Sequence, residues 1–280
     1  MPTILDADLD KVNKRTFVER QAVRVYGRAQ GWMDDGEHTA IEFVSGEVRG
    51  RRILDIGVGG GRTTSLLQPI STDYVGIDYA PTQIDTARHH HPGVDLRVMD
   101  ARELDFPDHS FDLVVFSFNG IDSVDIGGRL QILSEAHRVL RPGGSFLFSS
   151  LSLDGPSFRE KFSIPINFNK GFGRFARESA VFARWAAFSS IIGLRTYLRV
   201  RRRRHNLPSG FKLKQISPHY YGLVVVFSSM PAQVGQLRDA GFEVLKVFDE
   251  QGAQLDFACS VADSRWCYYC ARKPAAALPE

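Results

Sequence analysis

Between about Arg51 and Ser150, short runs of β-branched and aromatic residues alternate with segments of helical periodicity. This alternation is typical of successive βαβ units, whose strands are parallel and whose helices cover both faces of one sheet. The pattern predicts helices that begin near Thr63, Pro81 and Gly127. It predicts strands at Arg52–Ile56, Tyr74–Asp78, Leu96–Met99, Phe111–Phe116 and Ser145–Ser150. The fold class is therefore α/β with a doubly wound, mostly parallel sheet.

The segments on either side of this region predict the domain organisation. Residues 1–50 have the pattern of two helices that precede the sheet, and residues 51–152 hold the βαβ units. Residues 153–217 break the rhythm, since they are rich in Phe, Gly and Arg, and we expect an inserted, mostly helical cap. A helix and two strands return within residues 218–274, the last strand at Arg265–Lys273, and residues 275–280 form a loose tail.

Composition excludes several classes of protein. With 280 residues, 43% hydrophobic and 24% charged, the chain can bury a large core and is not disordered. It has no uninterrupted apolar run near the ~18 residues of a membrane span and no cleavable signal pattern at its start. Three cysteines fit a reducing, cytoplasmic setting, and a net charge of +3 makes nucleic acid an unlikely partner.

The first predicted strand leads into a glycine-rich turn. Asp55 precedes Gly57, Gly59 and Gly61, and residues without Cβ atoms let the backbone approach a ligand closely. The third glycine of a dinucleotide fingerprint is replaced by Arg62, and the Gly-Lys-Ser/Thr of a Walker A loop is missing. An acidic group beside such a turn suits an ammonium or sulfonium ligand better than a pyrophosphate.

Two more acidic residues follow the next two predicted strands. Asp78 lies 21 residues after Gly57, where a carboxylate can accept hydrogen bonds from both hydroxyls of a ribose. The alternative role, an N-cap for the helix at Pro81, can be served by its neighbours. Asp100 follows the third strand and can accept from an exocyclic adenine amine. Because ligands bind outside the carboxyl ends of parallel strands, the three acids converge on one crevice.

The sequence resembles the class I, Rossmann-like S-adenosylmethionine-dependent methyltransferases. Four motifs carry the resemblance, in family order: Leu54–Gly61, Val75–Asp78, Asp100–Ala101 with Leu104–Asp112, and Arg138–Gly144. The resemblance implies a seven-stranded sheet with an antiparallel last strand, and S-adenosylmethionine as cofactor. It places Asp55 and the glycines at the methionine moiety, Asp78 at the ribose, and Asp100 with Ala101 at the adenine. Further cofactor-binding candidates are Tyr26, on a helix that could act as a lid, Tyr79 and Ser117.

Catalysis of methyl transfer requires chiefly that the acceptor be held in line with the S–CH3 bond and water excluded. Asn119 can orient the acceptor or the methionine amine, or can simply be a turn residue. His219 could remove a proton, and Tyr221 or its neighbour Tyr220 could present a ring to the cation. Alternatively, these residues have a purely structural role and pack under the cap.

Three other groups of residues say less about the function. His89–His91 fit a solvated helix end, and Cys267 with Cys270 cannot close a tetrahedral site, so we predict no metal. Arg199–Arg204 form a basic run that is either a solvated face or a surface for nucleic acid or an anionic carrier domain. The leading hypothesis is a methyltransferase of a small molecule. The alternatives are an enzyme that cyclises or transfers part of S-adenosylmethionine itself, releasing methylthioadenosine, and a binding function of the basic run. The sequence leaves the oligomeric state open.

Overall fold

The computed structural model describes residues 31–160, 207–216, 223–258 and 261–275, together with residues 13, 191 and 198. Several predicted features lie outside the described residues. They are Tyr26, His219, Tyr220, Tyr221 and the run Arg199–Arg204.

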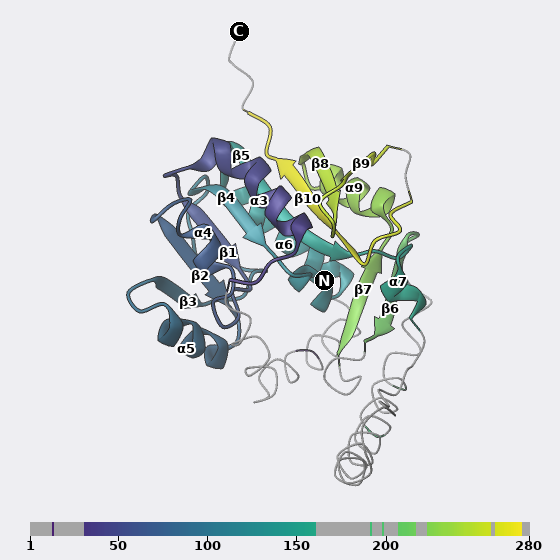
Figure 1. Cartoon of the computed structure of the whole chain (residues 1–280), viewed down its shortest axis with the longest axis horizontal. Coiled ribbons are helices and arrows are strands. Elements are labelled where there is room, and N and C mark those ends of the chain that lie inside the picture. Colours follow the sequence, from purple (N-terminus) through teal and green to yellow (C-terminus); the bar gives the residue numbers. More distant parts are fainter. Residues whose placement is uncertain are drawn as a thin grey trace, which may run out of the picture.

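An eight-stranded sheet forms the centre of the molecule, with strand order β3-β2-β1-β4-β5-β10-β8-β9 (Figure 1). The strands are β1 (Ile53–Ile56), β2 (Tyr74–Asp78), β3 (Asp95–Val98), β4 (Phe111–Phe116), β5 (Leu140–Leu151), β8 (Glu243–Asp249), β9 (Gln254–Leu255) and β10 (Trp266–Arg272). Strands β1 to β5 pair in parallel, and β10 is antiparallel to both β5 and β8. The predicted doubly wound sheet with an antiparallel last strand is confirmed, and the two-residue β9 adds an edge to the seven strands expected.

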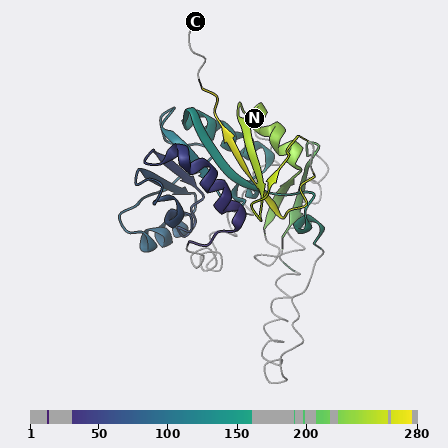
Figure 2. The same ribbon diagram turned by 45° about the horizontal axis from the view of Figure 1, so that its top comes forward.

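Helices cover both faces of this sheet. They are α3 (Asp35–Val48), α4 (Thr64–Leu67), α5 (Pro81–His90), α6 (Ile126–Val139), α7 (Pro156–Arg159) and α9 (Met230–Asp239), with a 3-10 helix η1 (Gly120–Ser123) after β4. One core joins α6 and α9 to one face, through residues such as Leu133 and Leu237. The second core packs α3, α4 and α5 on the other face, and Figure 2 shows α3 lying over β5, β8 and β10. No helix in the described part of the chain is long and apolar enough to span a membrane.

A separate hairpin pairs β6 (Phe211–Gln215) with β7 (Val224–Ser228). Strand β6 falls within residues 153–217, which are expected to be mostly helical, so these five residues are an exception, and most of the segment lies outside the described residues. Its buried Phe211 and Leu213 flank the exposed Lys212, the alternation of a half-buried strand. A single parallel bridge from Ser228 to Ser152 joins the hairpin to the chain just after β5.

The order of the strands reverses between β1 and β4. From β1 the chain continues outward through β2 and β3, whereas β4 lies on the other side of β1 and leads to β5. In an open parallel sheet, this switch point leaves a crevice beyond the carboxyl ends of the strands. The glycine-rich turn after β1 and the loop after β4 are the two segments that border it.

Candidate active site

A cavity of about 420 Å³ lies at the carboxyl ends of the central strands. Its size is within the range of small-molecule sites. One side, which we call the β1–β3 wall, consists of Ile56, Gly57, Val58, Gly59, Gly60, Thr63, Ile77, Asp78, Tyr79, Gln83, Met99 and Ala101. The other side, the β4–β10 wall, consists of Trp32, Phe116, Ser117, Phe118, Asn119, Gly120, Ser123, Leu151, Ile216, Leu223, Val225 and Trp266. Arg62 completes the lining.

The glycine-rich turn needs its glycines. Gly57, Gly59 and Gly61 have φ values of +69°, +55° and +95°, which side chains with a Cβ rarely adopt. A Cβ on Gly57 would also lie 2.8 Å from Cε2 of Phe116. Gly57 and Gly59 line the cavity, but Gly61 faces away from it, toward His91.

The histidines at the end of α5 pack on the same turn. The Nδ1 atom of His90 lies 2.9 Å from the carbonyl oxygen of Gly60, and Nε2 of His91 lies 2.9 Å from that of Gly61. The helix end is solvated as expected, since His90 is exposed and His91 half-buried, and the two rings also brace the turn from outside. A ring nitrogen that faces a carbonyl oxygen must carry the proton.

Asp55 lies behind the turn rather than in the cavity. Its Oδ2 accepts hydrogen bonds from the Thr63 hydroxyl at 2.5 Å and the Tyr74 hydroxyl at 2.7 Å. Burial raises the pKa of Asp55 to about 6, against the effect of both hydrogen bonds. The residue expected to face the methionine moiety therefore orients Thr63, and Thr63 is the one that lines the cavity.

Asp78 does line the cavity, at the end of β2. Its Oδ2 accepts from the backbone N–H of Gly59 at 3.0 Å, and its Oδ1 accepts from that of Ala80 at 2.8 Å. Burial raises the pKa of this carboxyl to about 6. Each carboxylate oxygen has a further lone pair to offer. The side chain is thus fixed by the glycine-rich turn and remains able to accept hydrogen bonds from a ligand.

Asp100 is placed differently from Asp78. Its carboxylate forms a bidentate ion pair with Arg102, with a shortest distance of 2.6 Å. It lines a smaller space of about 50 Å³ that shares Tyr79 and Ala101 with the main cavity. Of the three acids that the sequence predicts to converge, one therefore lies in the cavity, one lies behind it and one lies beside it.

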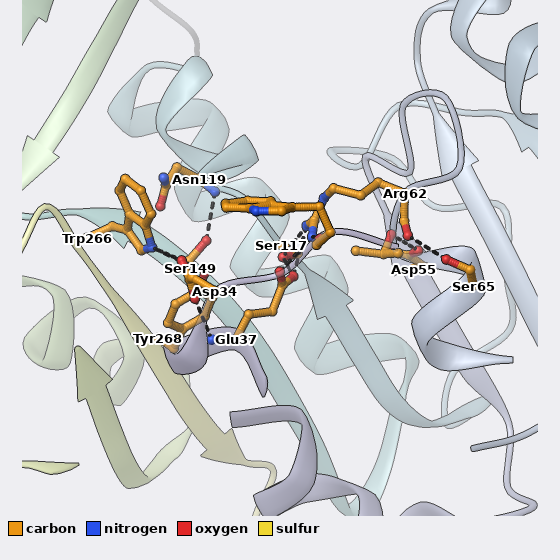
Figure 3. A network of polar contacts seen from close by, with 12 residues as sticks. Asp34, Glu37, Asp55, Arg62, Ser65, Ser117, Asn119, Ser149, Trp266 and Tyr268 are labelled. Atoms are coloured by element: carbon orange, nitrogen blue, oxygen red, sulfur yellow. Dashed lines mark hydrogen bonds and ion pairs between the residues drawn. The ribbon is translucent and has the colours of Figure 1, made fainter. Parts of the chain in front are cut away.

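A buried ion pair joins α3 to the glycine-rich turn (Figure 3). The two guanidinium NH groups of Arg62 donate to the two carboxylate oxygens of Glu37, at 2.6 and 2.8 Å. Arg62 also donates to the carbonyl oxygen of Trp32 at 2.6 Å and to the hydroxyl of Ser117 at 3.0 Å, and that hydroxyl donates to Glu37. The Glu37 side chain is 1% exposed. Ser117, predicted as a cofactor contact, lies in the lining but also holds this network together.

Sequence reasoning missed Glu37. A glutamate three residues after the N-cap residue Asp34 is typical of a capping box and gives no sign of a site. The useful signal was Arg62, because a cation that replaces a glycine in a tight, buried turn requires an anionic partner. The sequence does not say which of its acidic residues supplies that partner.

Aromatic rings form part of the β4–β10 wall. Phe118 packs edge-on against Trp32 and Trp266, with ring centroids 5.7 and 6.2 Å apart. Asp34 accepts hydrogen bonds from Trp266 Nε1 at 3.0 Å and from the Tyr268 hydroxyl at 2.9 Å, which fixes the indole. Burial raises the pKa of Asp34.

Asn119 follows Phe118 in an unusual backbone conformation. Phe118 and Asn119 have φ values of +52° and +59°, a left-handed region that non-glycine residues occupy at a cost and that is concentrated at functional sites. The Asn119 backbone N–H donates to the Ser149 hydroxyl at 2.7 Å. Its side-chain Oδ1 is buried and has no hydrogen-bond partner among the described residues.

Beneath this loop lies a buried polar network that the sequence did not reveal. Asp122 and Arg129 pair with both side chains 0% exposed. Asp122 also accepts from the Leu151 backbone N–H at 2.6 Å, and Arg129 donates to the side-chain oxygen of Gln233. The network ties η1 to β5, α6 and α9, so it fixes the loop that carries Asn119.

Comparison with known proteins identifies the domain. Residues 53–144 match the family model described as a methyltransferase domain. A probable S-adenosylmethionine-dependent methyltransferase of Mycolicibacterium smegmatis is 38% identical over 101 residues, and a fatty-acid O-methyltransferase of the same organism is 35% identical over 108 residues. These matches cover 36% and 37% of this chain and 38% of each relative, so the chain spans well under half of the length of the relatives it matches.

A solved structure extends the likeness of the fold. An S-adenosylmethionine-dependent methyltransferase from Mesorhizobium loti superposes with a TM-score of 0.53 at 20% identity and covers 85% of this chain and 97% of that one. The likeness therefore includes strands well beyond residues 53–144. Residues 53–144 are therefore a methyltransferase domain, and the chain has the class I, Rossmann-like fold of the S-adenosylmethionine-dependent methyltransferases.

Proposed function

We propose that this protein is an enzyme that binds S-adenosylmethionine and transfers its methyl group to a small molecule. The observation that carries the proposal is the pairing of Asp78 with Gly59 in the lining of the cavity, because it presents a fixed carboxylate beside a turn without Cβ atoms. The chain covers only part of its relatives, so their names support a class of reaction and leave the acceptor to be determined.

The cavity fits this cofactor in two respects. Gly57 and Gly59 line it in left-handed backbone conformations that expose the backbone of the turn, and the buried Oε1 atom of Gln83 has no partner among the described residues although Gln83 lines the cavity. In the proposed pose, Asp78 accepts from the ribose hydroxyls. Ala101 and Tyr79 lie at the adenine, and Asp100, which Arg102 holds, lies beside them. Gly57, Gly59 and Ser117 face the methionine moiety, while Asp55 and Gly61 shape the turn.

The proposed mechanism needs little chemistry from the protein. When bound, S-adenosylmethionine supplies a methyl group on a sulfonium, which an acceptor lone pair can take while the S–C electron pair stays on sulfur. The β4–β10 wall excludes water and orients the acceptor, which is catalysis by proximity and desolvation. The titratable side chains of the described lining are Arg62, Asp78 and Tyr79, and all three already have partners.

Three residues outside the described part of the chain have proposed roles in this reaction. His219 is the proposed base for an acceptor that arrives protonated, Tyr221 the proposed ring beside the sulfonium, and Tyr26 a cofactor contact on the N-terminal segment. Residues 1–50 and 153–217 are the proposed lid and cap, and residues 51–152 and 218–274 complete the Rossmann-like domain.

Isothermal titration calorimetry with S-adenosylhomocysteine, S-adenosylmethionine and NADH tests the proposal. We expect both sulfur compounds to bind and NADH not to bind. Incubation with S-adenosylmethionine alone then separates methyl transfer from consumption of the cofactor. Accumulation of methylthioadenosine without an acceptor would favour the alternative chemistry, and a steep loss of RNA binding with salt would favour a role for Arg199–Arg204.

A further inference from the structure

We infer that the acceptor is an uncharged, flat apolar molecule that bears a hydroxyl or N–H group, with its ring against Phe118 and Trp266 and that group at the Asn119 carboxamide. The inference rests on the proposed function, since it assigns the β4–β10 wall to the acceptor. It goes beyond that function by naming the class of acceptor and the residue that orients it.

The composition of the wall favours an apolar acceptor. Leu151, Leu223 and Val225 bring aliphatic side chains from β5 and from the region of β7. Phe118 lines the cavity and is 40% exposed although it is large and apolar; Trp32 and Trp266 contact it edge-on, and the Arg62 guanidinium lies 5.2 Å from its ring centroid. Exposed aromatic surface of this kind gains free energy when a second ring covers it.

The charges of the wall favour an uncharged acceptor. Arg62 is the cation of the described lining, and Glu37 neutralises it with two hydrogen bonds. A carboxylate acceptor would therefore lose its hydration without gaining a free cation from the described part of the lining. An ammonium acceptor meets the same difficulty, because Glu37 is paired and Asp34 lies behind Trp266. Burial of an unpaired charge costs far more than burial of a neutral group.

Asn119 supplies the specific contact. The consecutive left-handed residues and the bond from the Asn119 N–H to Ser149 fix the backbone of Asn119, which lines the cavity, and the buried network of Asp122 and Arg129 holds the loop. Figure 3 draws Asn119 and Trp266 on one side of the Glu37–Arg62 pair and Asp55 on the other. A carboxamide whose oxygen has no partner gains a hydrogen bond when an acceptor hydroxyl or N–H donates to it.

The test measures binding to the full chain saturated with S-adenosylhomocysteine, by equilibrium dialysis. The probes are 2-naphthol, 2-methylnaphthalene, which lacks the donor, and 3-hydroxy-2-naphthoate, which adds a carboxylate. We expect 2-naphthol to bind at least about tenfold more tightly than the carboxylate. We also expect Asn119→Gly, which tolerates the left-handed backbone, to lower the ratio of 2-naphthol to 2-methylnaphthalene affinity by about three- to tenfold.

Matched variants complete the design. Asn119→Asp keeps an oxygen acceptor and should retain the preference for the hydroxyl, and Ser123→Ala, at another polar residue of the wall, should also retain it. The inference is overturned if the carboxylate binds as well as 2-naphthol, if no naphthalene binds, or if Asn119→Gly leaves the ratio unchanged. Loss of S-adenosylhomocysteine affinity in Asn119→Gly would instead assign Asn119 to the cofactor. If the wild-type protein does not bind S-adenosylhomocysteine at all, the proposed function itself fails.

Discussion

The two walls of the cavity differ in how the chain builds them. The β1–β3 wall comes from one continuous stretch between Ile56 and Ala101, in which each strand ends in a loop at the same edge of the sheet. The β4–β10 wall collects residues from Trp32, the loop after β4, the end of β5, the region of the β6–β7 hairpin and Trp266. A local pattern is sufficient to specify the first wall, whereas only the completed tertiary fold specifies the second.

The walls also differ in chemistry. The β1–β3 wall combines glycines, aliphatic side chains, polar side chains and one carboxylate, whereas the β4–β10 wall has rings and aliphatic side chains but no carboxylate among its described residues. The comparison implies that substitutions in the first wall should change cofactor affinity and leave stability largely intact. Substitutions beneath the second wall should act first on stability.

The largest effect is expected at the buried pair under the β4–β10 wall. Asp122→Ala leaves the Arg129 guanidinium buried without its anion, and we expect the free energy of unfolding to fall by about 3–5 kcal/mol. Urea denaturation followed by circular dichroism measures the change. The double variant Asp122→Leu with Arg129→Met should recover most of the loss, because it removes both charges. Equal losses in the single and double variants would contradict the assignment of the pair.

A smaller effect, on affinity, is expected in the β1–β3 wall. Asp78→Ala removes the proposed acceptor of the ribose hydroxyls, and S-adenosylhomocysteine should bind about ten- to a hundredfold more weakly, corresponding to roughly 1.5–3 kcal/mol. Calorimetry measures the affinity. The melting temperature should change little, in contrast to Asp122→Ala. Unchanged affinity would remove Asp78 from the cofactor site.

The affinity that depends on Asp78 should itself change about tenfold with pH. The pKa of Asp78 is raised to about 6 by burial, so lowering the pH from 7 to 5 protonates the carboxyl that must accept from the ribose. We expect S-adenosylhomocysteine affinity to fall by roughly tenfold at pH 5, and Asp78→Asn to flatten the profile. Asp55, whose pKa is also raised to about 6, is the competing cause, and a profile that Asp55→Asn flattens instead would assign the titration to the turn.

The contribution of Asp78 to folding stability should change with pH in the opposite direction to its contribution to cofactor affinity. Because the pKa of Asp78 is higher in the folded than in the unfolded chain, the contribution of this carboxyl to stability is fully present below pH 3.8 and is lost as the pH rises through about 6. Acidification from pH 7 to 5 therefore weakens cofactor binding while this carboxyl favours the folded state.

The smallest effect is expected for Asp100→Ala. Arg102 already holds both oxygens of this half-buried carboxylate, so its removal should weaken S-adenosylhomocysteine binding by about twofold or less. A loss of more than about tenfold in the calorimetric titration would show that Asp100 leaves Arg102 for the adenine, as the sequence pattern had suggested.

The strengths and failures of sequence analysis follow the same division between walls. Parallel strands, glycine-rich turns and the acid at the end of β2 depend on neighbours within a few residues, and they were predicted. Asp55 and Asp100 were placed at the correct strand ends, but the orientation of their carboxylates depends on Tyr74 and Arg102. Strand β7 was missed although its five residues are all buried, because an apolar run does not itself distinguish a strand from a helix.

The partners of buried charges could not be predicted. Glu37 and Arg62 are 25 residues apart, and Arg129 and Gln233 are 104 apart. A buried charged side chain requires a partner of opposite charge. The composition of the chain and the spacing of its residues do not say which residue the fold will bring to it. Of the β4–β10 wall, the sequence therefore predicted the segment around Ser117 and Asn119 but not Trp32, Leu151, Val225 or Trp266.

The ring of Phe116 connects the two walls. It packs so closely on both Gly57 and Gly120 that a Cβ on either would lie within 2.8 Å of its Cε2 atom. A ligand that displaces this ring from one wall must also change the free energy of binding at the other. By thermodynamic linkage, the factor by which the cofactor changes acceptor affinity equals the factor by which the acceptor changes cofactor affinity. Cooperativity between the two ligands could thus be adjusted at a single aromatic side chain.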